Sequence, residues 1–88
     1  MVSIKNKVFV KLEVPEIDRV YDIYLPVNKK IGNIINLLNQ AIYEMTNGEL
    51  ALSKENALYN KTTKERYSPD VLLLNTSIRN GTVLILVS

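Results

Sequence analysis

Residues 31–45 read IGNIINLLNQAIYEM and carry the strongest periodic signal in the chain. Apolar side chains recur there with the spacing of one face of an α-helix. Asn28 is the expected N-cap, and Asn47-Gly48 supplies a left-handed stop after the last turn. At 1.5 Å per residue the helix is roughly 25 Å long, enough to lie across one face of a small sheet. The apolar stripe consists of Ile31, Ile34, Ile35, Leu38, Ile42 and Met45.

Two strands are expected on the N-terminal side of this helix. Residues 7–14 read KVFVKLEV, in which apolar residues at even positions alternate with Phe9, Lys11 and Glu13. Residues 20–25 read VYDIYL and also alternate. Period two with β-branched residues is typical of half-buried strands, and the short polar connection at residues 15–19 predicts an antiparallel hairpin.

Further short strands follow the helix. Residues 57–60 are a strand candidate, residues 61–64 a turn, and residues 65–67 a short return strand. Ser68 is expected to cap a short helical turn that starts at Pro69. Asn80-Gly81 predicts a tight turn before residues 82–87, TVLILV, which are apolar on both faces. A run of this kind is typical of a central strand.

Composition narrows the possible chemistry. The chain has 88 residues, which predicts one domain over residues 1–88. It has no Cys and no His, so it lacks a thiolate nucleophile, the usual general base near neutral pH and the commonest metal ligand. We therefore expect no enzyme activity, no cofactor and no bound metal. The net charge of +2 is spread over both halves of the sequence, which argues against a nucleic-acid partner.

The hydropathy of the chain predicts a soluble, cytoplasmic protein. The N-terminus has no apolar segment typical of a secretion signal. The longest apolar runs are residues 71–74 and 83–87, far short of the ~20 residues of a membrane helix. No direct insertion into a membrane is expected.

The C-terminal motif resembles a known family. Residues 73–87 fit the pattern Leu-x-x-x-x-Ile-x-Asn-Gly-x-x-Leu-x-Leu through Leu73, Ile78, Asn80-Gly81, Leu84 and Leu86. With the hairpin and the long helix, this pattern resembles the ubiquitin-like β-grasp fold over about residues 6–87. Residues 20–31 are also similar to the bacterial YukD/EsaB-like branch, small ubiquitin-like proteins linked to type VII (WXG100/ESAT-6-type) secretion. The resemblance implies an α+β fold, β-β-α-β-β-β, with mixed sheet order 2-1-5-3-4 and the helix across one face.

The resemblance implies a non-enzymatic protein-interaction module, an accessory or regulatory component of such a secretion system. One alternative is a sulfur carrier or protein modifier, which is disfavoured because those proteins end in Gly-Gly and this sequence ends in Val87-Ser88. Another is the N-terminal cytosolic domain of a secretion membrane protein. The expected partners are proteins, with secretion-machinery components and a second copy of the chain as the candidates. The sequence identifies neither the partner nor the oligomeric state.

The last strand supplies the best candidate binding site. If Leu84 and Leu86 face the helix, alternate residues face away from it and form an apolar patch on the open side of the sheet. The alternative is ordinary strand composition with no binding role. The predicted protein-binding face comprises Phe9, Leu58, Val83, Ile85 and Val87.

Weaker candidates have simpler explanations. Acidic residues around the first hairpin would suit acid–base chemistry only if buried, and are more typical of solvated turn flanks. Basic residues at the 61–66 tip could contact an acidic partner or nucleic acid, although a solubilising tip is the simpler reading. Basic residues in the expected first helical turn could mark a binding use, although their cost there is small. Tyr21 and Tyr59 fit core positions, whereas Tyr24 is expected to face outward. The charged candidates are Glu13, Glu16, Asp18, Asp22, Lys29, Lys30, Lys61, Lys64 and Arg66.

Overall fold

The computed structural model describes residues 6–48 and 56–87. A hairpin of two long strands comes first, followed by one helix and two shorter strands. Two 3-10 turns, η2 (Pro15–Ile17) and η3 (Leu73–Asn75), lie in the connections. The main elements are β1 (Lys7–Val14), β2 (Arg19–Pro26), α1 (Ile31–Met45), β3 (Ala57–Asn60) and β4 (Val83–Val87).

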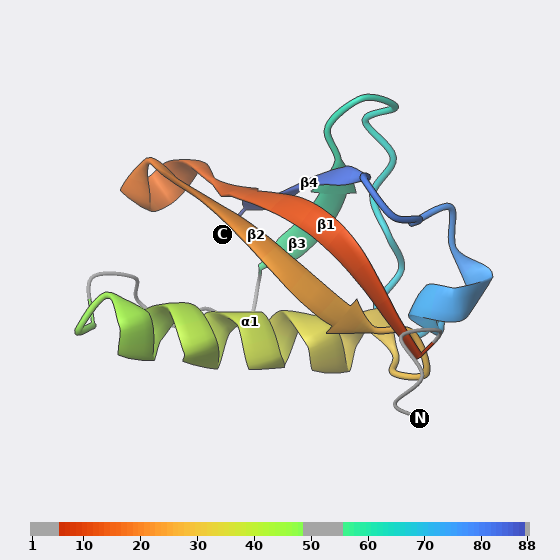
Figure 1. The fold of residues 1–88 in the computed structure, drawn as a ribbon, viewed down its shortest axis with the longest axis horizontal. Coiled ribbons are helices and arrows are strands. Elements are labelled where there is room, and N and C mark those ends of the chain that lie inside the picture. Colours follow the sequence, from red (N-terminus) through yellow and green to blue (C-terminus); the bar gives the residue numbers. More distant parts are fainter. Residues whose placement is uncertain (1–5, 49–55, 88) are drawn as a thin grey trace.

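The strands form one mixed sheet in the order β2-β1-β4-β3, and α1 lies along one of its faces (Figure 1). β1 pairs antiparallel with β2 over its whole length. It pairs parallel with β4 through Lys11–Val83, Leu12–Leu84 and Glu13–Ile85. β4 also pairs antiparallel with β3, so the C-terminal strand occupies a central place in the sheet. The expected hairpin, helix and central last strand are therefore confirmed.

The return strand expected at residues 65–67 is reduced to a single bridge. Arg66 pairs with Tyr59 alone. Two backbone hydrogen bonds flank the bridge, from the amide of Asn60 to the carbonyl of Glu65 (2.8 Å) and from the amide of Tyr67 to the carbonyl of Leu58 (3.0 Å). Among the described residues the sheet thus has four strands. The expected order 2-1-5-3-4 becomes β2-β1-β4-β3, because the expected fourth strand, at residues 65–67, does not form.

The hydrophobic core lies between α1 and the sheet. The even-numbered residues of β1 point into it, and so do Leu84 and Leu86 of β4. The helix contributes Ile31, Ile34, Ile35, Leu38 and Ile42, all of them buried. Met45, the last member of the predicted stripe, is 58% exposed because it lies in the final turn.

The start of α1 is capped differently from the expectation. Asn28 is not the N-cap, because Lys30 holds that position without a capping side chain. Instead, the first helical amides donate to backbone carbonyls of the following loop, Ile31 to Val71 and Gly32 to Pro69, each at 2.9 Å. A Cβ on Gly32 would meet the carbonyl oxygen of Pro69 at 3.2 Å. Glycine therefore permits the close approach of this loop to the helix.

The other predicted turns form, with one difference. Asn47 and Gly48 both have positive φ and end α1 as expected. The amide of Gly48 donates to the carbonyl of Tyr43 at 2.8 Å. Residues 68–70 form a turn rather than the expected helical turn, and the short helical segment starts later, at Leu73.

The Asn80-Gly81 turn attaches the last strand to β1. The side-chain oxygen of Asn80 accepts a hydrogen bond from the amide of Phe9 at 2.8 Å. The amide of Gly81 donates to the carbonyl of Phe9 at 2.8 Å, with Gly81 at φ 90°. Both backbone groups of Phe9 are thereby paired beyond the end of the β1–β4 ladder, since the ladder itself begins at Lys11 and Val83.

We predict that Ile35→Ala lowers the free energy of unfolding by about 2–5 kcal/mol, because it removes a buried side chain between helix and sheet. Urea denaturation measures this change. The control is Leu37→Ala on the same helix, where the side chain is 52% exposed and the expected loss is below about 1 kcal/mol. Equal losses for the two variants would contradict the packing described above.

We also predict that Asn80→Ala costs about 0.5–1.5 kcal/mol, since it leaves the amide of Phe9 without its acceptor. Hydrogen exchange should show faster exchange of the Phe9 amide in this variant. Asn75→Ala, at another exposed asparagine, should leave that amide unchanged. An unaltered exchange rate in Asn80→Ala would exclude the bond as a stabilising contact.

Candidate functional site

The sheet face opposite α1, called here the outer face, carries an aliphatic patch. Within the strands, residues paired side by side project to the same face. The register Ile85–Tyr59 and Val87–Ala57 therefore places β3 residues beside those of β4. Val83 and Ile85 are half-buried, and Val87 is 43% exposed. The aliphatic patch consists of Val83, Ile85 and Val87, with Tyr59 and the largely buried Ala57 of β3 beside them.

Leu58 does not belong to this face, contrary to the expectation from sequence. It pairs with Leu86 and is 0% exposed in the core. Tyr59 takes the outward position instead, so the core position expected for Tyr59 is wrong. The β3–β4 register sets these positions, and it also buries Asn60, whose side-chain oxygen accepts hydrogen bonds from the amides of Thr62 (2.9 Å) and Thr63 (3.1 Å). In β3 the polar residue Asn60 therefore faces the core and the aromatic residue Tyr59 faces outward, the reverse of the usual pattern in a strand.

Phe9 lies on the outer face but forms a separate aromatic pair with Tyr24. Their ring centroids are 5.0 Å apart with a tilt of 55°, a geometry typical of favourable aromatic contacts. Phe9 is 40% exposed and Tyr24 is 62% exposed. The outward position expected for Tyr24 is confirmed.

A row of charged residues separates the aromatic pair from the aliphatic patch. Lys11 lies next to Val83 across the β1–β4 pairing, and Glu13 lies next to Ile85. The ammonium of Lys11 is 3.6 Å from the carboxylate of Asp22. Glu13 is paired at 2.6 Å with Lys61. The predicted face is therefore two small apolar areas with ion pairs between them.

The aliphatic patch is hollowed at its edge. A shallow depression of about 340 Å³ is lined by Tyr59, Asn60, Lys64, Ile85 and Val87. Its walls are apolar except for Asn60 and Lys64. A concave apolar surface with a cationic margin suits the insertion of an apolar side chain from another molecule, with a carboxylate beside it.

The acidic residues of the first hairpin do not form a catalytic pair. Glu13 and Asp22 point to the outer face and are engaged with lysines. Asp18 is exposed in the turn, where its backbone is left-handed with φ 53°. Within residues 6–48 and 56–87, no three acidic, His or Cys side chains come together as a metal site would require. The absence of metal and of enzyme activity stays a prediction.

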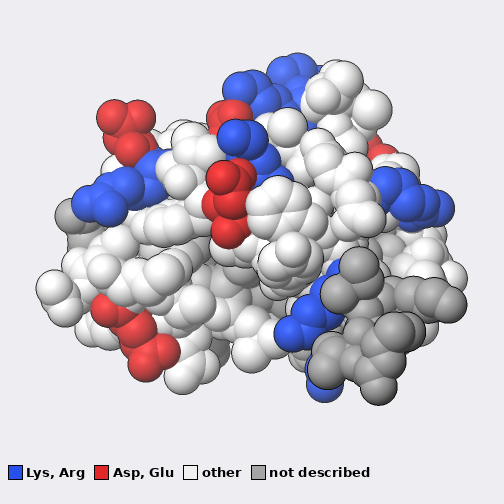
Figure 2. Space-filling model, in the orientation of Figure 1, with Lys and Arg blue, Asp and Glu red and all other residues white. Residues whose placement is uncertain are grey.

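The basic candidates lie at two exposed sites. Lys61, Lys64 and Arg66 occupy the tip after β3, and Figure 2 shows basic side chains gathered there at the top of the molecule. Lys64 has a positive φ of 66°. Lys29 and Lys30 precede the helix, rather than lying in its first turn as expected.

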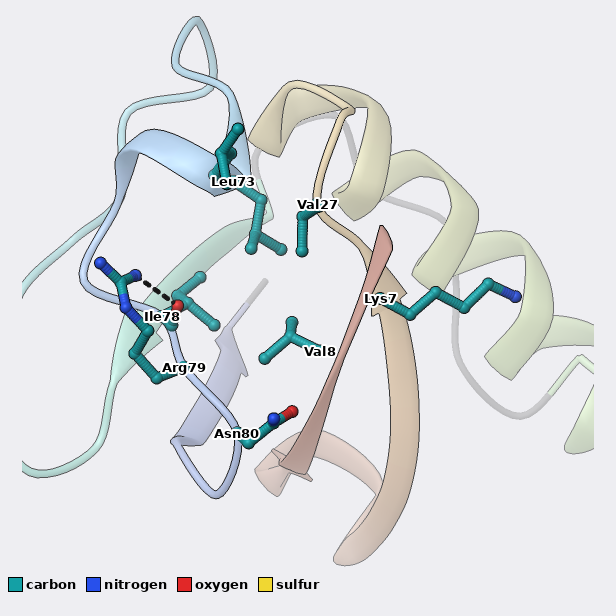
Figure 3. Close-up of a pocket in the computed structure, with 8 residues that line it drawn as sticks. Lys7, Val8, Val27, Leu73, Ile78, Arg79 and Asn80 are labelled. Atoms are coloured by element: carbon teal, nitrogen blue, oxygen red, sulfur yellow. Dashed lines mark hydrogen bonds between the residues drawn. The ribbon is translucent and has the colours of Figure 1, made fainter. Parts of the chain in front are cut away.

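A second pocket, of about 290 Å³, lies between the start of β1 and the η3 segment (Figure 3). The charged ends of Lys7 and Arg79 point away from each other, so they do not converge on a ligand. The guanidinium of Arg79 donates to the carbonyls of Thr76 (2.7 Å) and Ile78 (2.8 Å). Asn80 is occupied by the amide of Phe9. The polar groups of this pocket thus serve the fold.

No helix in the described ranges combines the length and hydropathy that a membrane crossing needs. This finding concerns residues 6–48 and 56–87 only.

Comparison with known proteins gives likeness in fold only. No family model and no curated protein matches the sequence. The ubiquitin-like domain of the Mycobacterium tuberculosis type VII secretion protein EccD1 is similar, with a TM-score of 0.68 and 18% identity over 93% of this chain and 98% of that one. The ubiquitin-like domain of PLXNC1 gives 0.72 at 13% identity, covering 92% and 97% of the two chains.

A third similar structure belongs to a larger assembly. A chain of the ESX-5 inner membrane complex free of MycP5 matches with a TM-score of 0.66 and 15% identity, covering 92% of this chain and 20% of that chain. Together with one helix packed on a mixed sheet of order β2-β1-β4-β3, these likenesses settle the architecture. The chain has the ubiquitin-like β-grasp fold, of class α+β.

Proposed function

We propose that this chain is a non-enzymatic protein-interaction module that acts as an accessory or regulatory component of a bacterial type VII secretion system. The observation that carries the proposal is the aliphatic patch on the outer face. Val83, Ile85 and Val87 are all apolar, although the helix covers only the other side of β4. A strand with one wetted face normally alternates apolar and polar residues. Because β4 departs from that pattern, we infer that a partner covers the outer face.

The arrangement of polar groups supports binding rather than catalysis. Glu13 and Lys61 are paired with each other at 2.6 Å, and in the described part of the chain no three acidic side chains come together as a metal site would require. The depression beside Ile85 is lined mostly by apolar side chains. Such a surface gains binding energy from burial of apolar area, and the neighbouring charges orient the partner.

The link to secretion rests on two similar structures and on the resemblance of residues 20–31 to the YukD/EsaB-like branch. Those structures are the ubiquitin-like domain of EccD1 and a chain of the ESX-5 inner membrane complex. The proposed partners are cytosolic parts of the secretion machinery. The coverage of only 20% of the ESX-5 chain supports a second form of the proposal, in which the domain is joined to a membrane component.

The test is deletion of the gene in its native host, with export of small WXG100-type proteins measured by immunoblotting of the culture medium. We expect export to fall at least tenfold and to return when the parent chain is supplied. Unchanged export after deletion would contradict the secretion role.

We predict that Ile85→Lys, alone or with Phe9→Lys, does not restore export although both variants stay folded. Both side chains are partly open to solvent on the outer face, so a lysine can extend away from the sheet. Circular dichroism should show a melting midpoint within a few degrees of the parent. Val20→Lys, at a residue 57% exposed on β2, is the matched control and should restore export.

Two results would count against this use of the patch. Variants that fold and restore export would show that the apolar run is ordinary strand composition. Variants that unfold as readily as Ile35→Ala would show that the outer face is covered within the chain itself.

A further inference from the structure

One end of the molecule, at the right of Figure 1, is built from three chain segments that are hydrogen-bonded side by side. The amide of Val27 donates to the carbonyl of Asn6 (3.0 Å), and the amide of Leu74 donates to the carbonyl of Val27 (2.9 Å). The amide of Leu73 donates to the carbonyl of Lys29, also at 2.9 Å. These bonds join the start of β1, the connection from β2 to α1 and the η3 region. The surface that they form, called here the basic end, consists of residues 6–8, 27–30 and 72–80.

The pocket of about 290 Å³ shown in Figure 3 lies in this end. Its floor is aliphatic, because Val8, Leu73 and Ile78 line it and are all buried. At its rim Leu74 is 59% exposed and Val27 is half-buried. An exposed leucine beside a recess with an aliphatic floor suits the burial of one large apolar side chain from another molecule.

The cations of the basic end have no carboxylate partner. Among the described residues, none of these four side chains forms an ion pair. The three segments of the basic end contain no acidic residue. Their charges therefore stay uncompensated within the segments themselves. The four cations are Lys7, Lys29, Lys30 and Arg79.

Two carboxylates adjoin the basic end without neutralising it. Glu65 accepts a hydrogen bond from the hydroxyl of Ser77 at 2.9 Å. Asp70 lies in the turn that leads into the η3 region. Four cations against these two carboxylates leave an excess of two positive charges. An acidic partner is therefore attracted to this end of the molecule.

The cations flank the pocket on opposite sides. In Figure 3 the side chains of Lys7 and Arg79 lie on either side of it, and their charged ends point apart. One guanidinium nitrogen of Arg79 donates to the carbonyls of Thr76 (2.7 Å) and Ile78 (2.8 Å), which hold the side chain in place and leave its charge uncompensated. A single small anion does not reach both cations. Carboxylates at the two ends of a segment that crosses the pocket do.

We propose that the basic end docks an acidic segment of another protein, which inserts one large apolar side chain into the pocket and carries carboxylates on both sides of it. The apolar side chain packs against Leu74 above the buried floor. The flanking carboxylates lie beside Lys7 on one side and Arg79 on the other. Lys29 and Lys30 add to the attraction. This site is separate from the aliphatic patch and does not depend on the proposed secretion role.

Three other occupants fit the basic end less well. A flat bilayer surface reaches Leu74 but not the buried floor of the recess. A nucleic acid finds no aromatic side chain on which to stack its bases, since the three segments contain none. A second copy of the chain, related by a twofold axis through this end, brings like charges together. An acidic protein segment fits both the recess and the charges.

The probe for the test is the synthetic peptide acetyl-Asp-Glu-Ser-Phe-Ser-Glu-Asp-amide, titrated into the isotope-labelled protein and followed by NMR. We expect saturable shifts at the amides of Val27, Leu74 and Arg79, and weaker binding at high salt because exposed charges are screened. A peptide with lysine in place of its four acidic residues should bind at least tenfold more weakly. Replacing its phenylalanine by glycine should also weaken binding at least tenfold, because the pocket then stays unfilled.

Charge variants of the protein test the cations. Lys7→Gln combined with Arg79→Gln should weaken peptide binding at least tenfold. The matched control is Lys64→Gln combined with Arg66→Gln, which removes two cations from the exposed tip after β3. Because this control changes the net charge by the same amount at another place, it should weaken binding less than threefold.

A second charge variant keeps the test valid if loss of the Arg79 side-chain bonds unfolds the first one. It is Lys29→Gln combined with Lys30→Gln. Neither lysine side chain has a hydrogen-bond or ion-pair partner among the described residues, so this variant should stay folded. We expect it to bind the peptide at least threefold more weakly than the parent.

Leucine variants test the pocket. Leu74→Ser should weaken peptide binding at least fivefold. The control is Leu37→Ser, which should bind as the parent does, because Leu37 is similarly exposed (52%) but lies in a separate apolar recess between β2 and α1. Ile85→Lys should also bind the peptide as the parent does, because it alters only the aliphatic patch. The recess beside Leu37, called here the β2 groove, is lined by residues 23–26 and by Ile34, Leu37, Leu38 and Ala41.

Four results would overturn the proposal. The first is the absence of shifts at millimolar peptide. The second is a folded Lys7→Gln, Arg79→Gln variant that binds the peptide as the parent does. The third is sedimentation with phosphatidylglycerol vesicles that this variant loses, while the peptide does not bind, since that would assign the basic end to a membrane surface. The fourth is a set of shifts at Val27 and Leu74 that grow with protein concentration without peptide, since that would indicate self-association.

Discussion

The parallel pairing of β4 with β1 is the contact on which the rest of the sheet depends. It joins the N-terminal hairpin to the last strand, and β4 is in turn the only strand neighbour of β3 in the described sheet. The partners are far apart in sequence: Phe9 and Asn80 are separated by 71 positions. Closing so long a loop costs chain entropy before any contact is gained. Apolar burial of Leu84 and Leu86, together with the paired backbone of Phe9, offsets this cost.

The features that could be predicted from sequence are those set by local periodicity. The helix at 31–45 and the alternation in β1 need no knowledge of distant partners, and both appear in the structure as expected. The Asn80-Gly81 turn was also predictable, because few residue pairs favour the required backbone.

The features that escaped prediction depend on contacts across the fold. Which face Leu58 and Tyr59 occupy is decided by the β3–β4 register, and a four-residue strand has too few residues to reveal its phase. Burial of Asn60 is allowed because its side-chain oxygen accepts from the amides of Thr62 and Thr63, and its side-chain nitrogen donates to the hydroxyl of Tyr67 at 3.1 Å. The amides at the start of α1 likewise bond carbonyls of a distant loop, so the prediction of Asn28 as the N-cap was wrong.

The candidate site shows the same division. The sequence indicated an apolar outer face on β4, and Val83, Ile85 and Val87 do lie there. It did not indicate that Lys11 and Glu13 would divide Phe9 from this patch, because the division arises from the pairing of β1 with β4. The groove beside β2 was equally hidden, since it is formed by residues of two elements that no single periodic pattern connects.

The attachment of α1 to residues 69–71 has a consequence for local opening. The first two helical amides have their acceptors in a loop almost forty positions later, so the first turn of the helix and this loop must order together. A ligand that pulled residues 69–71 away would leave the first two helical amides without acceptors, close to Ile34, the first α1 residue in the lining of the β2 groove. Because the loop and the first turn of α1 share these hydrogen bonds, we expect them to open together as one local unit.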